Sequence, residues 1–348
     1  MDNLLYKRIK NLIAEQIKAL PPHSALMSEN QFCLKYDASR MTVRRALNEL
    51  VQEKKVYKIR GKGTFSAPPP PSQPKTGEQL VAAVLPSADT RFMDDIIQGM
   101  VTYCRDRNVK FLTLFTRNSY FLERDALQTA ARLGCMGIVF MPIDAASPDG
   151  IVDFERNHPQ IPIIFIDRKH PDFKFGYVGS NHFDIGYTAA SYLIKNGRAD
   201  IALLIPYRKP SSVLERMQGF SRAAKELLGS NEKANYIQYN SMVSFPDQFF
   251  DFFEKHPTID GIVSNSGKPA DDIIISLRRL NKKVPDDFSM ILIDTESAYL
   301  SNYLNCNFQT IIQSGFQIGY TALEELFAVL ARSVEPHDTC IPFSLRLV

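Results

Sequence analysis

The sequence predicts an α/β protein with two parts, a small helical head and a larger body that contains two doubly wound parallel sheets. One observation is a change in charge along the chain: residues 1–68 hold 13 Lys or Arg and 6 Asp or Glu, whereas residues 69–348 hold 28 and 32. The other is that short apolar runs alternate with amphipathic helical patterns about every 25 to 30 residues beyond residue 80. This alternation is typical of parallel strands whose two sheet faces are covered by helices.

The composition excludes several classes of protein. With 348 residues, of which 45% are hydrophobic and 23% charged, the chain can form more than one hydrophobic core. No segment approaches the roughly 18 uninterrupted apolar residues of a membrane helix, and the amino terminus lacks the apolar core of a secretory signal. The five cysteines are scattered and never form a Cys-x-x-Cys pair, which favours a reducing compartment. We therefore expect a cytoplasmic protein without a membrane partner.

Three helical patterns follow one another in the basic head. Apolar residues recur at three- and four-residue spacing over residues 3–20, and two prolines end this first helix. Ser28 and Gln31 form a capping box that starts a short second helix running to about Lys35. Ser39 offers an N-cap for a third helix with one apolar stripe and basic residues outside it. The stripe consists of Val43, Ala46, Leu47 and Leu50, and the basic residues are Arg40, Arg44 and Arg45.

Two strand patterns, residues 56–59 and 64–66, complete the head and are joined by a turn that carries Arg60, Gly61, Lys62 and Gly63. The glycines allow the tip of this hairpin to approach a phosphate backbone closely. An exposed arginine or a glycine turn alone indicates only a solvated surface. Three helices followed by a basic hairpin, in this order, predict a winged helix-turn-helix whose third helix enters the major groove of DNA.

The segment after the head predicts a linker. Pro68, Pro69, Pro70, Pro71 and Pro74 crowd a stretch that ends at about residue 79. Proline cannot donate to a helix or a central strand and favours an extended chain. The predicted domains are therefore a DNA-binding head over residues 1–68, a proline-rich linker over residues 69–79, and a body over residues 80–348.

Eight apolar runs predict the strands of the body. Eight strands with intervening helices fit two doubly wound lobes better than one sheet, and ligands then bind between the lobes at the carboxyl ends of the strands. The predicted strands span residues 80–85, 111–115, 137–141, 161–166, 201–205, 236–239, 261–264 and 290–293, with a final one at 341–347.

Polar side chains stand at these strand ends. Asp167 and Arg168 follow one strand, Asn265 and Asp294 follow two others, and Arg216 lies near the start of a helix. Carboxylate, amide and guanidinium groups together suit a polyhydroxylated neutral ligand, because they accept from and donate to neighbouring hydroxyls. Each residue alone could be only a helix cap or a solvated side chain. Together they predict a ligand site.

No catalytic set accompanies this site. The six histidines have no metal-ligand spacing, and the Gly-x-Ser-x-Gly, Walker and Gly-x-Gly-x-x-Gly motifs are absent. We therefore expect no metal, no cofactor and no enzymatic activity.

The head resembles the DNA-binding head of the GntR family. The runs SRMTVRRAL at 39–47 and GKGTF at 61–65 carry the likeness, which spans residues 3–67. Arg45, on the exposed face of the third helix, is a further candidate beside the contacts that the resemblance implies. Those implied DNA contacts are Arg40, Thr42 and Arg44 in the third helix, and Gly61 and Lys62 in the hairpin.

Two departures from the family pattern concern the second helix. The usual Pro-Ser-Glu is Met27-Ser28-Glu29 here, and Asn30 stands where the family often has a basic residue. The missing charge predicts one fewer DNA contact and a different operator preference.

The body resembles the effector-binding region of the lactose repressor family, itself similar to periplasmic sugar-binding proteins. The best segment is 161–204, with further matches at ERMQGF (215–220) and VPDDFS (284–289). The family often has an acidic residue after Asn265 and after Asp294, where this chain has Ser266 and Thr295; this leaves the identity of the sugar open. The effector contacts that the resemblance implies are Arg216, Asn265 and Asp294, with Phe92 and Asp167.

The pairing of these two parts resembles that of arabinose-responsive repressors. It implies a homodimeric repressor of carbohydrate utilisation genes that leaves its operator DNA on binding a monosaccharide, such as the pentose arabinose or the deoxyhexose fucose. One alternative is a regulator whose effector is a phosphosugar or a nucleobase, for which Arg91, Arg168 and Arg216 are the available cations. The other is a sugar-acting enzyme fused to a DNA-binding head.

Overall fold

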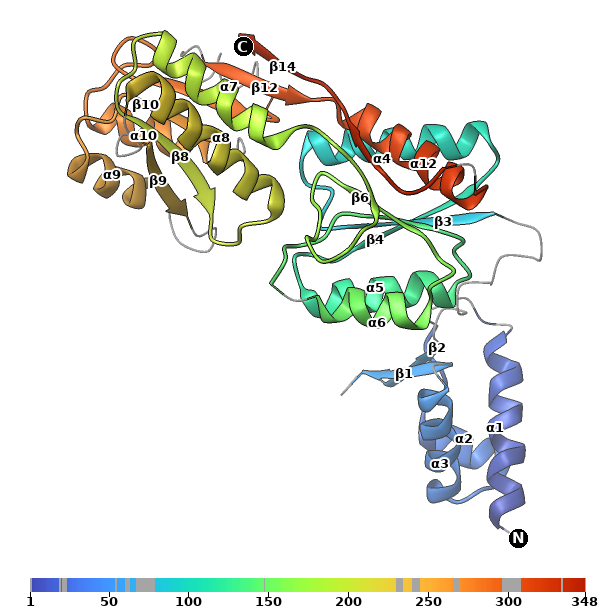
Figure 1. Cartoon of the computed structure of the whole chain (residues 1–348). Helices are drawn as coiled ribbons and strands as arrows, with labels where there is room; N and C mark the ends of the chain where they lie inside the picture. Colours follow the sequence, from blue (N-terminus) through green and yellow to red (C-terminus); the bar gives the residue numbers. More distant parts are fainter. Residues whose placement is uncertain are drawn as a thin grey trace. The chain divides into compact units, whose positions relative to one another are not determined.

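The computed structural model divides the chain into two compact units, Met1–Lys75 and Thr76–Val348, called here the head and the body (Figure 1). The predicted linker lies almost entirely outside the described residues. The structure describes residues 2–18, 20, 24–53, 55–59, 63–66, 79–146, 148–229, 234–239, 245–265, 269–295, 308–332 and 334–347.

The head has the predicted order of three helices and an antiparallel hairpin. Its elements are α1 (Asp2–Lys18), α2 (Glu29–Tyr36), α3 (Arg40–Gln52), β1 (Val56–Ile59) and β2 (Gly63–Ser66). The capping box between Ser28 and Gln31 starts α2 as predicted. All four stripe residues of α3 are fully buried, and they pack against Ile9 and Ile13 of α1 and Phe32 of α2.

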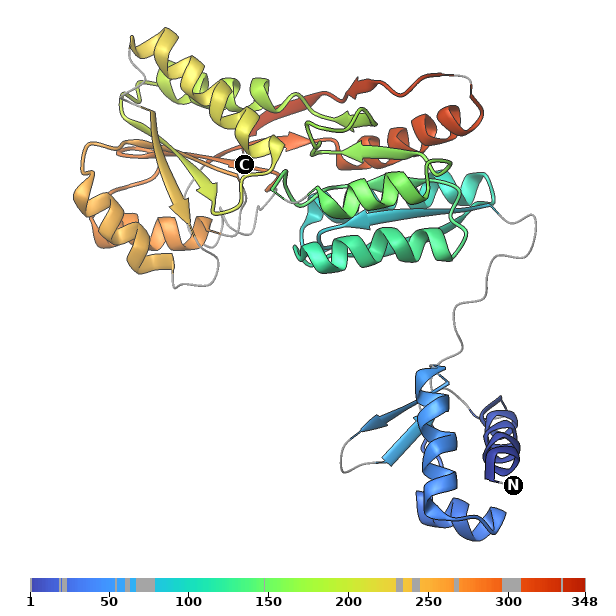
Figure 2. The ribbon, with the colours of Figure 1, turned by 60° about the horizontal axis from the view of Figure 1, so that its bottom comes forward.

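The first lobe of the body is a parallel six-stranded sheet covered on both faces. Helices α4 (Arg91–Asp106) and α12 (Gly315–Leu330) pack on one face, and α5 (Tyr120–Arg132) and α6 (Asp149–Asn157) pack on the other (Figure 2). The strand order is β13-β7-β6-β5-β3-β4. These strands are β3 (Leu80–Leu85), β4 (Lys110–Phe115), β5 (Ile138–Phe140), β6 (Ile163–Ile166), β7 (Gly176–Gly179) and β13 (Asp338–Cys340).

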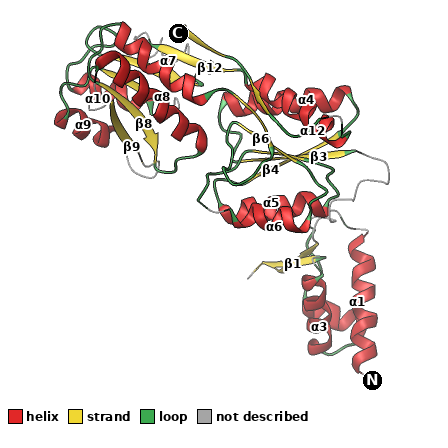
Figure 3. Ribbon diagram, in the orientation of Figure 1, coloured by secondary structure: helices red, strands yellow, loops and turns green. Residues whose placement is uncertain are grey.

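The second lobe repeats this plan. Helices α7 (His182–Lys195) and α8 (Ser211–Leu228) cover one face, and α9 (Phe245–Lys255) and α10 (Ala270–Arg279) cover the other (Figure 3). Its strand order is β14-β12-β11-β10-β8-β9, in which only β14 runs antiparallel to its neighbour. The strands are β8 (Ile201–Pro206), β9 (Ala234–Tyr239), β10 (Gly261–Ser264), β11 (Ser289–Ile293), β12 (Gln309–Gln313) and β14 (Phe343–Leu347).

The chain crosses between the two lobes three times. It passes from β7 to α7, returns from β12 to α12, and passes again from β13 to β14. The last crossings place α12 against α4 and β13 beside β7, so each lobe contains segments that lie far apart in the sequence. Among the described residues, no helix is long and apolar enough to span a membrane.

Candidate DNA-binding face and ligand cleft

One carboxylate gathers three basic side chains on the face of the head that carries α3. The Glu29 carboxylate lies 3.1 Å from Arg44 Nη2, 3.7 Å from Arg40 Nε and 3.6 Å from Lys58 Nζ. The hydrogen bond from Arg44, together with the nearby positive charges, lowers the pKa of Glu29. The Arg44 and Arg40 side chains remain 49% and 66% exposed, so their guanidinium groups are accessible to a polyanion.

The other predicted DNA contacts have different surroundings. The Ser39 hydroxyl caps α3 by accepting from the Thr42 amide, and the two hydroxyl oxygens lie 2.8 Å apart. The Arg45 guanidinium lies over the Tyr6 ring, 4.0 Å from its centroid, and thus packs α3 against α1. Gly61 and Lys62 lie outside the described residues. All six DNA contacts stay predictions.

We expect Arg45→Ala to destabilise the head more than it weakens DNA binding. The substitution removes a cation–π contact worth about 0.5–2 kcal/mol, which corresponds to a fall of a few degrees in the melting temperature. Circular dichroism melting and operator titration measure the two effects on the same preparation. A large loss of operator affinity at an unchanged melting temperature would contradict this expectation, because it would show that Arg45 contacts DNA and does not stabilise the head.

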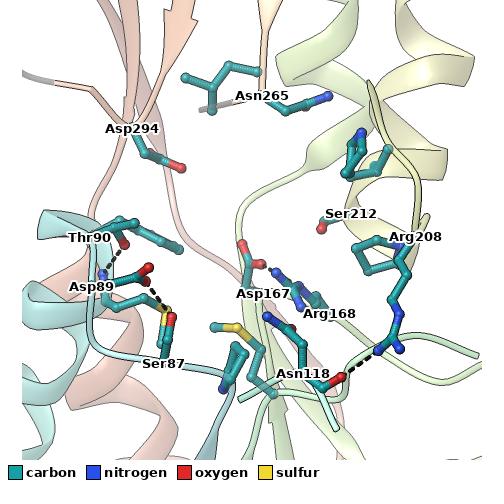
Figure 4. Close-up of a pocket in the computed structure, with 18 of the residues that line it drawn as sticks. Ser87, Asp89, Thr90, Asn118, Asp167, Arg168, Arg208, Ser212, Asn265 and Asp294 are labelled. Carbon is teal, nitrogen blue, oxygen red and sulfur yellow. Dashed lines mark hydrogen bonds and ion pairs between the residues drawn. The ribbon is translucent and has the colours of Figure 1, made fainter. Parts of the chain in front are cut away.

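A cleft of about 1070 Å³ lies between the lobes of the body, and all five predicted effector residues line it. Figure 4 labels three of them, Asp167, Asn265 and Asp294. Phe92 on α4 and Asp167 after β6 line it from the first lobe, while Arg216 on α8, Asn265 after β10 and Asp294 after β11 line it from the second. The described strand ends therefore meet across the cleft as the parallel-sheet pattern predicted. That these residues bind an effector remains a prediction.

Arg216 and Asn265 form one side of the cleft. Arg216 Nη1 donates to Asn265 Oδ1 at 3.2 Å, and Asn265 Nδ2 donates to the Leu204 carbonyl at 2.6 Å. Only 5% of Arg216 is exposed, and its Nε has no hydrogen-bond partner among the described residues. A side chain at Gly186 of α7 would collide with the Arg216 carbonyl, so glycine there lets α7 and α8 pack closely enough to hold Arg216 in place.

Asp294 has a left-handed backbone conformation (φ 54°), and its amide donates to the Ile311 carbonyl of the neighbouring strand β12 at 2.8 Å. The Gln313 amide and Nε2 donate to its two carboxylate oxygens at 3.0 and 2.6 Å. Removal from water raises the pKa of Asp294 to about 6, although Arg216 and Gln313 favour its charged form. Sequence analysis missed Gln313, because it ends a strand, β12, that the apolar pattern did not reveal.

Asp167 has the same left-handed conformation (φ 57°) at the corresponding strand end of the first lobe. Its carbonyl oxygen lies 2.7 Å from His182 Nε2, and burial lowers the pKa of His182 to about 4, so the neutral imidazole donates this bond. Arg168 Nε lies 3.6 Å from the Asp167 carboxylate. Asp167 Oδ1 and Arg168 Nε are buried without hydrogen-bond partners among the described residues, and both residues line the cleft.

Asp294 gives ligand binding a predictable pH dependence. An Asp carboxyl with a pKa of about 6 takes up a proton below that pH and then accepts hydrogen bonds poorly. We expect the dissociation constant of the ligand to rise about tenfold between pH 8 and pH 5. The empty protein changes in the opposite direction: since the unfolded aspartate titrates near 3.8, protonation stabilises the fold as the pH falls from 6.

Calorimetric titration at several pH values tests both statements, with Asp294→Asn as the matched control. The variant is expected to bind weakly and without this pH dependence. An unchanged pH profile in Asp294→Asn would show that another group is responsible.

The fold and the cleft define a regulator class in which a small DNA-binding head is joined to a two-lobed binding body. Residues 81–333 match the family described as periplasmic binding protein domain, and the chain belongs to this family. Residues 5–65 match bacterial regulatory proteins of the gntR family.

Similar proteins include transcriptional repressors that align over most of this chain. An arabinose metabolism transcriptional repressor of Halalkalibacterium halodurans is 23% identical over 339 residues, covering 94% of this chain and 88% of that protein. One from Geobacillus stearothermophilus is 24% identical over 338 residues, covering 93% and 89%. The HTH-type transcriptional repressor PurR of Vibrio campbellii is 26% identical over 253 residues, covering 71% and 73%.

Solved structures share the fold of the body. The transcription regulator CcpA of Lactococcus lactis has a TM-score of 0.66 at 18% identity, covering 77% of this chain and 97% of that one. A Caulobacter myo-inositol binding protein bound to myo-inositol has a TM-score of 0.67 at 17% identity, covering 78% and 94%.

Proposed function

We propose that this protein is a sequence-specific transcriptional repressor, active in the cytoplasm, that releases operator DNA when a neutral monosaccharide binds in the cleft. The observation that carries the proposal is the set of charged and amide side chains from both lobes that line the cleft, namely Asp167, Arg168, Arg216, Asn265 and Asp294. Charged donors and acceptors at these positions complement the hydroxyls of a sugar ring. The aromatic side chains of Phe92 and Tyr239 also line the cleft and offer faces on which a sugar ring can stack.

The names of similar regulators support both the repressor function and the sugar effector. Two of them are called arabinose metabolism transcriptional repressors and align over more than nine-tenths of this chain. A pentose or a deoxyhexose is therefore the first effector to test. Their name as repressors also supports a non-enzymatic function.

The mechanism couples the two parts through a dimer. Two heads on a homodimer would bind the half-sites of a pseudo-palindromic operator. A sugar that bridges the lobes would draw them together and change the geometry of the dimer. A hundredfold change in operator affinity requires the sugar to distinguish the two states by about 2.7 kcal/mol.

A phosphosugar is the second candidate because the cleft contains more arginines than sequence analysis counted. Arg117 and Arg208 line it together with Arg91, Arg168 and Arg216. Arginine recognises phosphate through paired hydrogen bonds, so phosphate esters belong in the ligand screen.

The test is a thermal-shift panel of pentoses, hexoses, deoxyhexoses and their phosphates on the full chain. A ligand present at a hundred times its dissociation constant stabilises the fold by about 2.7 kcal/mol, which is a shift of a few degrees. A neutral sugar that shifts the melting temperature and releases labelled operator DNA is the expected result. A response to phosphates alone would establish the second candidate, and no response from a folded, operator-binding protein would contradict the sugar assignment.

A further inference from the structure

Arg208 bridges the two lobes of the body at the edge of the cleft. It follows β8 in the second lobe, and its Nη1 donates to the carbonyl oxygen of Asn118 in the first lobe at 2.6 Å (Figure 4). Its guanidinium also lies over the ring of Tyr120, 4.8 Å from the ring centroid. Arg208 and Asn118 both line the cleft. The side chain therefore spans the space that separates the lobes.

Two acidic side chains of the first lobe lie near the Arg208 guanidinium and the Tyr120 ring. The Tyr120 hydroxyl donates to the Asp144 carboxylate, with both oxygens 2.8 Å away, and burial with this hydrogen bond raises the pKa of Tyr120 to about 12. Nearby, the Glu123 side chain is buried and accepts from the Ile143 amide at 2.9 Å. The ring that Arg208 covers is thus fixed by the Asp144 carboxylate. Burial raises the pKa of Glu123 to about 7, and the nearby charge of Arg208 favours its ionised form.

The same loop of the second lobe makes another contact with the first. The Ser211 hydroxyl, three residues after Arg208, accepts from the Lys169 amide at 2.9 Å. The segment that starts α8 is therefore attached to the first lobe at two points. Of these two contacts, the one made by Arg208 involves a charged side chain. The helix that follows, α8, also contains the predicted ligand residue Arg216.

We propose that Arg208 is a positioning residue that holds the mouth of the cleft closed over a bound ligand and thereby sets how fast the ligand leaves. Ligand release requires the lobes to separate, which breaks the bond to Asn118 and the stacking on Tyr120. Ligand entry starts from separated lobes, in which neither contact exists. Removing Arg208 should therefore raise the dissociation rate, and the association rate should not fall, because the open form becomes more populated. The predicted change in dissociation rate rests on the proposed function, because it needs a ligand. The predicted role of Arg208 in lobe closure does not.

The first measurement needs no ligand. Spin labels incorporated at Glu155 on α6 and Lys225 on α8, both exposed and in different lobes, report the separation of the lobes. We expect Arg208→Ala and Tyr120→Leu to broaden the distance distribution toward longer values, and the double variant to add little beyond either. Arg222→Ala, which removes an exposed arginine of the same lobe, is the matched control.

The second measurement is stopped-flow kinetics with the monosaccharide that the thermal-shift panel identifies. The chain has no tryptophan, so Tyr207→Trp places a single tryptophan, whose emission can be excited selectively, in the wall of the cleft. In this background we expect Arg208→Ala to raise the dissociation rate about tenfold, with an association rate equal to or above that of the parent. Tyr120→Phe, which keeps the ring, is expected to have a smaller effect.

The outcomes separate this proposal from the proposed function. If no sugar binds, the sugar assignment fails, and the distance measurement alone decides the role of Arg208. Unchanged distances in Arg208→Ala would overturn the proposal. An association rate that falls as far as the dissociation rate rises would also overturn it, because it would show a disturbed site rather than a lost closure contact.

Discussion

Arg216→Ala is expected to lower the affinity for the effector at least a hundredfold while operator binding is retained. Arg216 is 5% exposed, donates to Asn265 and has a buried Nε without a partner among the described residues. Each hydrogen bond from a charged group contributes about 1.5–3 kcal/mol, and the truncation removes those to the ligand and leaves the Asn265 oxygen without its donor. Calorimetric titration of the full chain with the sugar gives the affinity.

Two variants define the interpretation of that experiment. Arg216→Lys keeps the charge but not the planar pair of donors, so it should recover only part of the affinity. Arg222→Ala, at an exposed position of the same helix, should bind like the parent. Full affinity in Arg216→Ala would place the ligand elsewhere in the cleft.

Arg44→Ala is expected to lower operator affinity about a hundredfold and leave effector binding unchanged. Its guanidinium is exposed on α3 and fixed toward Glu29 by two hydrogen bonds, at 3.1 and 3.3 Å. A bidentate arginine contact to a guanine discriminates by about 1–3 kcal/mol, and the lost charge also weakens the attraction to phosphates. Fluorescence anisotropy with labelled operator measures the loss.

The salt dependence and one control make this test specific. Loss of a base contact should be large on the operator and small on unrelated DNA, whereas loss of a phosphate contact weakens both and lowers the salt slope by about one. Arg105→Ala removes an exposed arginine from the body and should have no effect. Unchanged operator affinity in Arg44→Ala would remove α3 from the DNA interface.

The head could be predicted almost residue by residue because its signals are local. The caps at Ser28 and Ser39 and the apolar stripe of α3 each depend on residues only a few positions apart in the sequence. The central strands of the body were equally visible, since both their faces are buried and their sequences are continuously apolar. These strands position Asp167, Asn265 and Asp294, which explains why strand ends alone located the cleft.

The remaining elements depend on contacts between distant segments. Sequence analysis missed three strands because none of them is a continuous apolar run. Strand β7 has a glycine at each end, β13 is polar, and β12 has only two apolar residues, with a glutamine at each end. Their pairing comes from neighbours already in place, as when β13 joins β7 across more than 150 residues of sequence. For the same reason, neither Gln313 beside Asp294 nor Arg208 over Tyr120 could be inferred from spacing.

The exchange of segments between the lobes determines when this protein can become functional during its synthesis. The head contains only residues from the first 75 and can fold as soon as it leaves the ribosome. Neither lobe can do so, because residues 309–347 supply β12 and β14 to one and α12 and β13 to the other. A nascent chain therefore carries a DNA-binding head well before its cleft has formed. A premature stop codon before residue 309 would leave a DNA-binding head whose operator binding no effector could regulate.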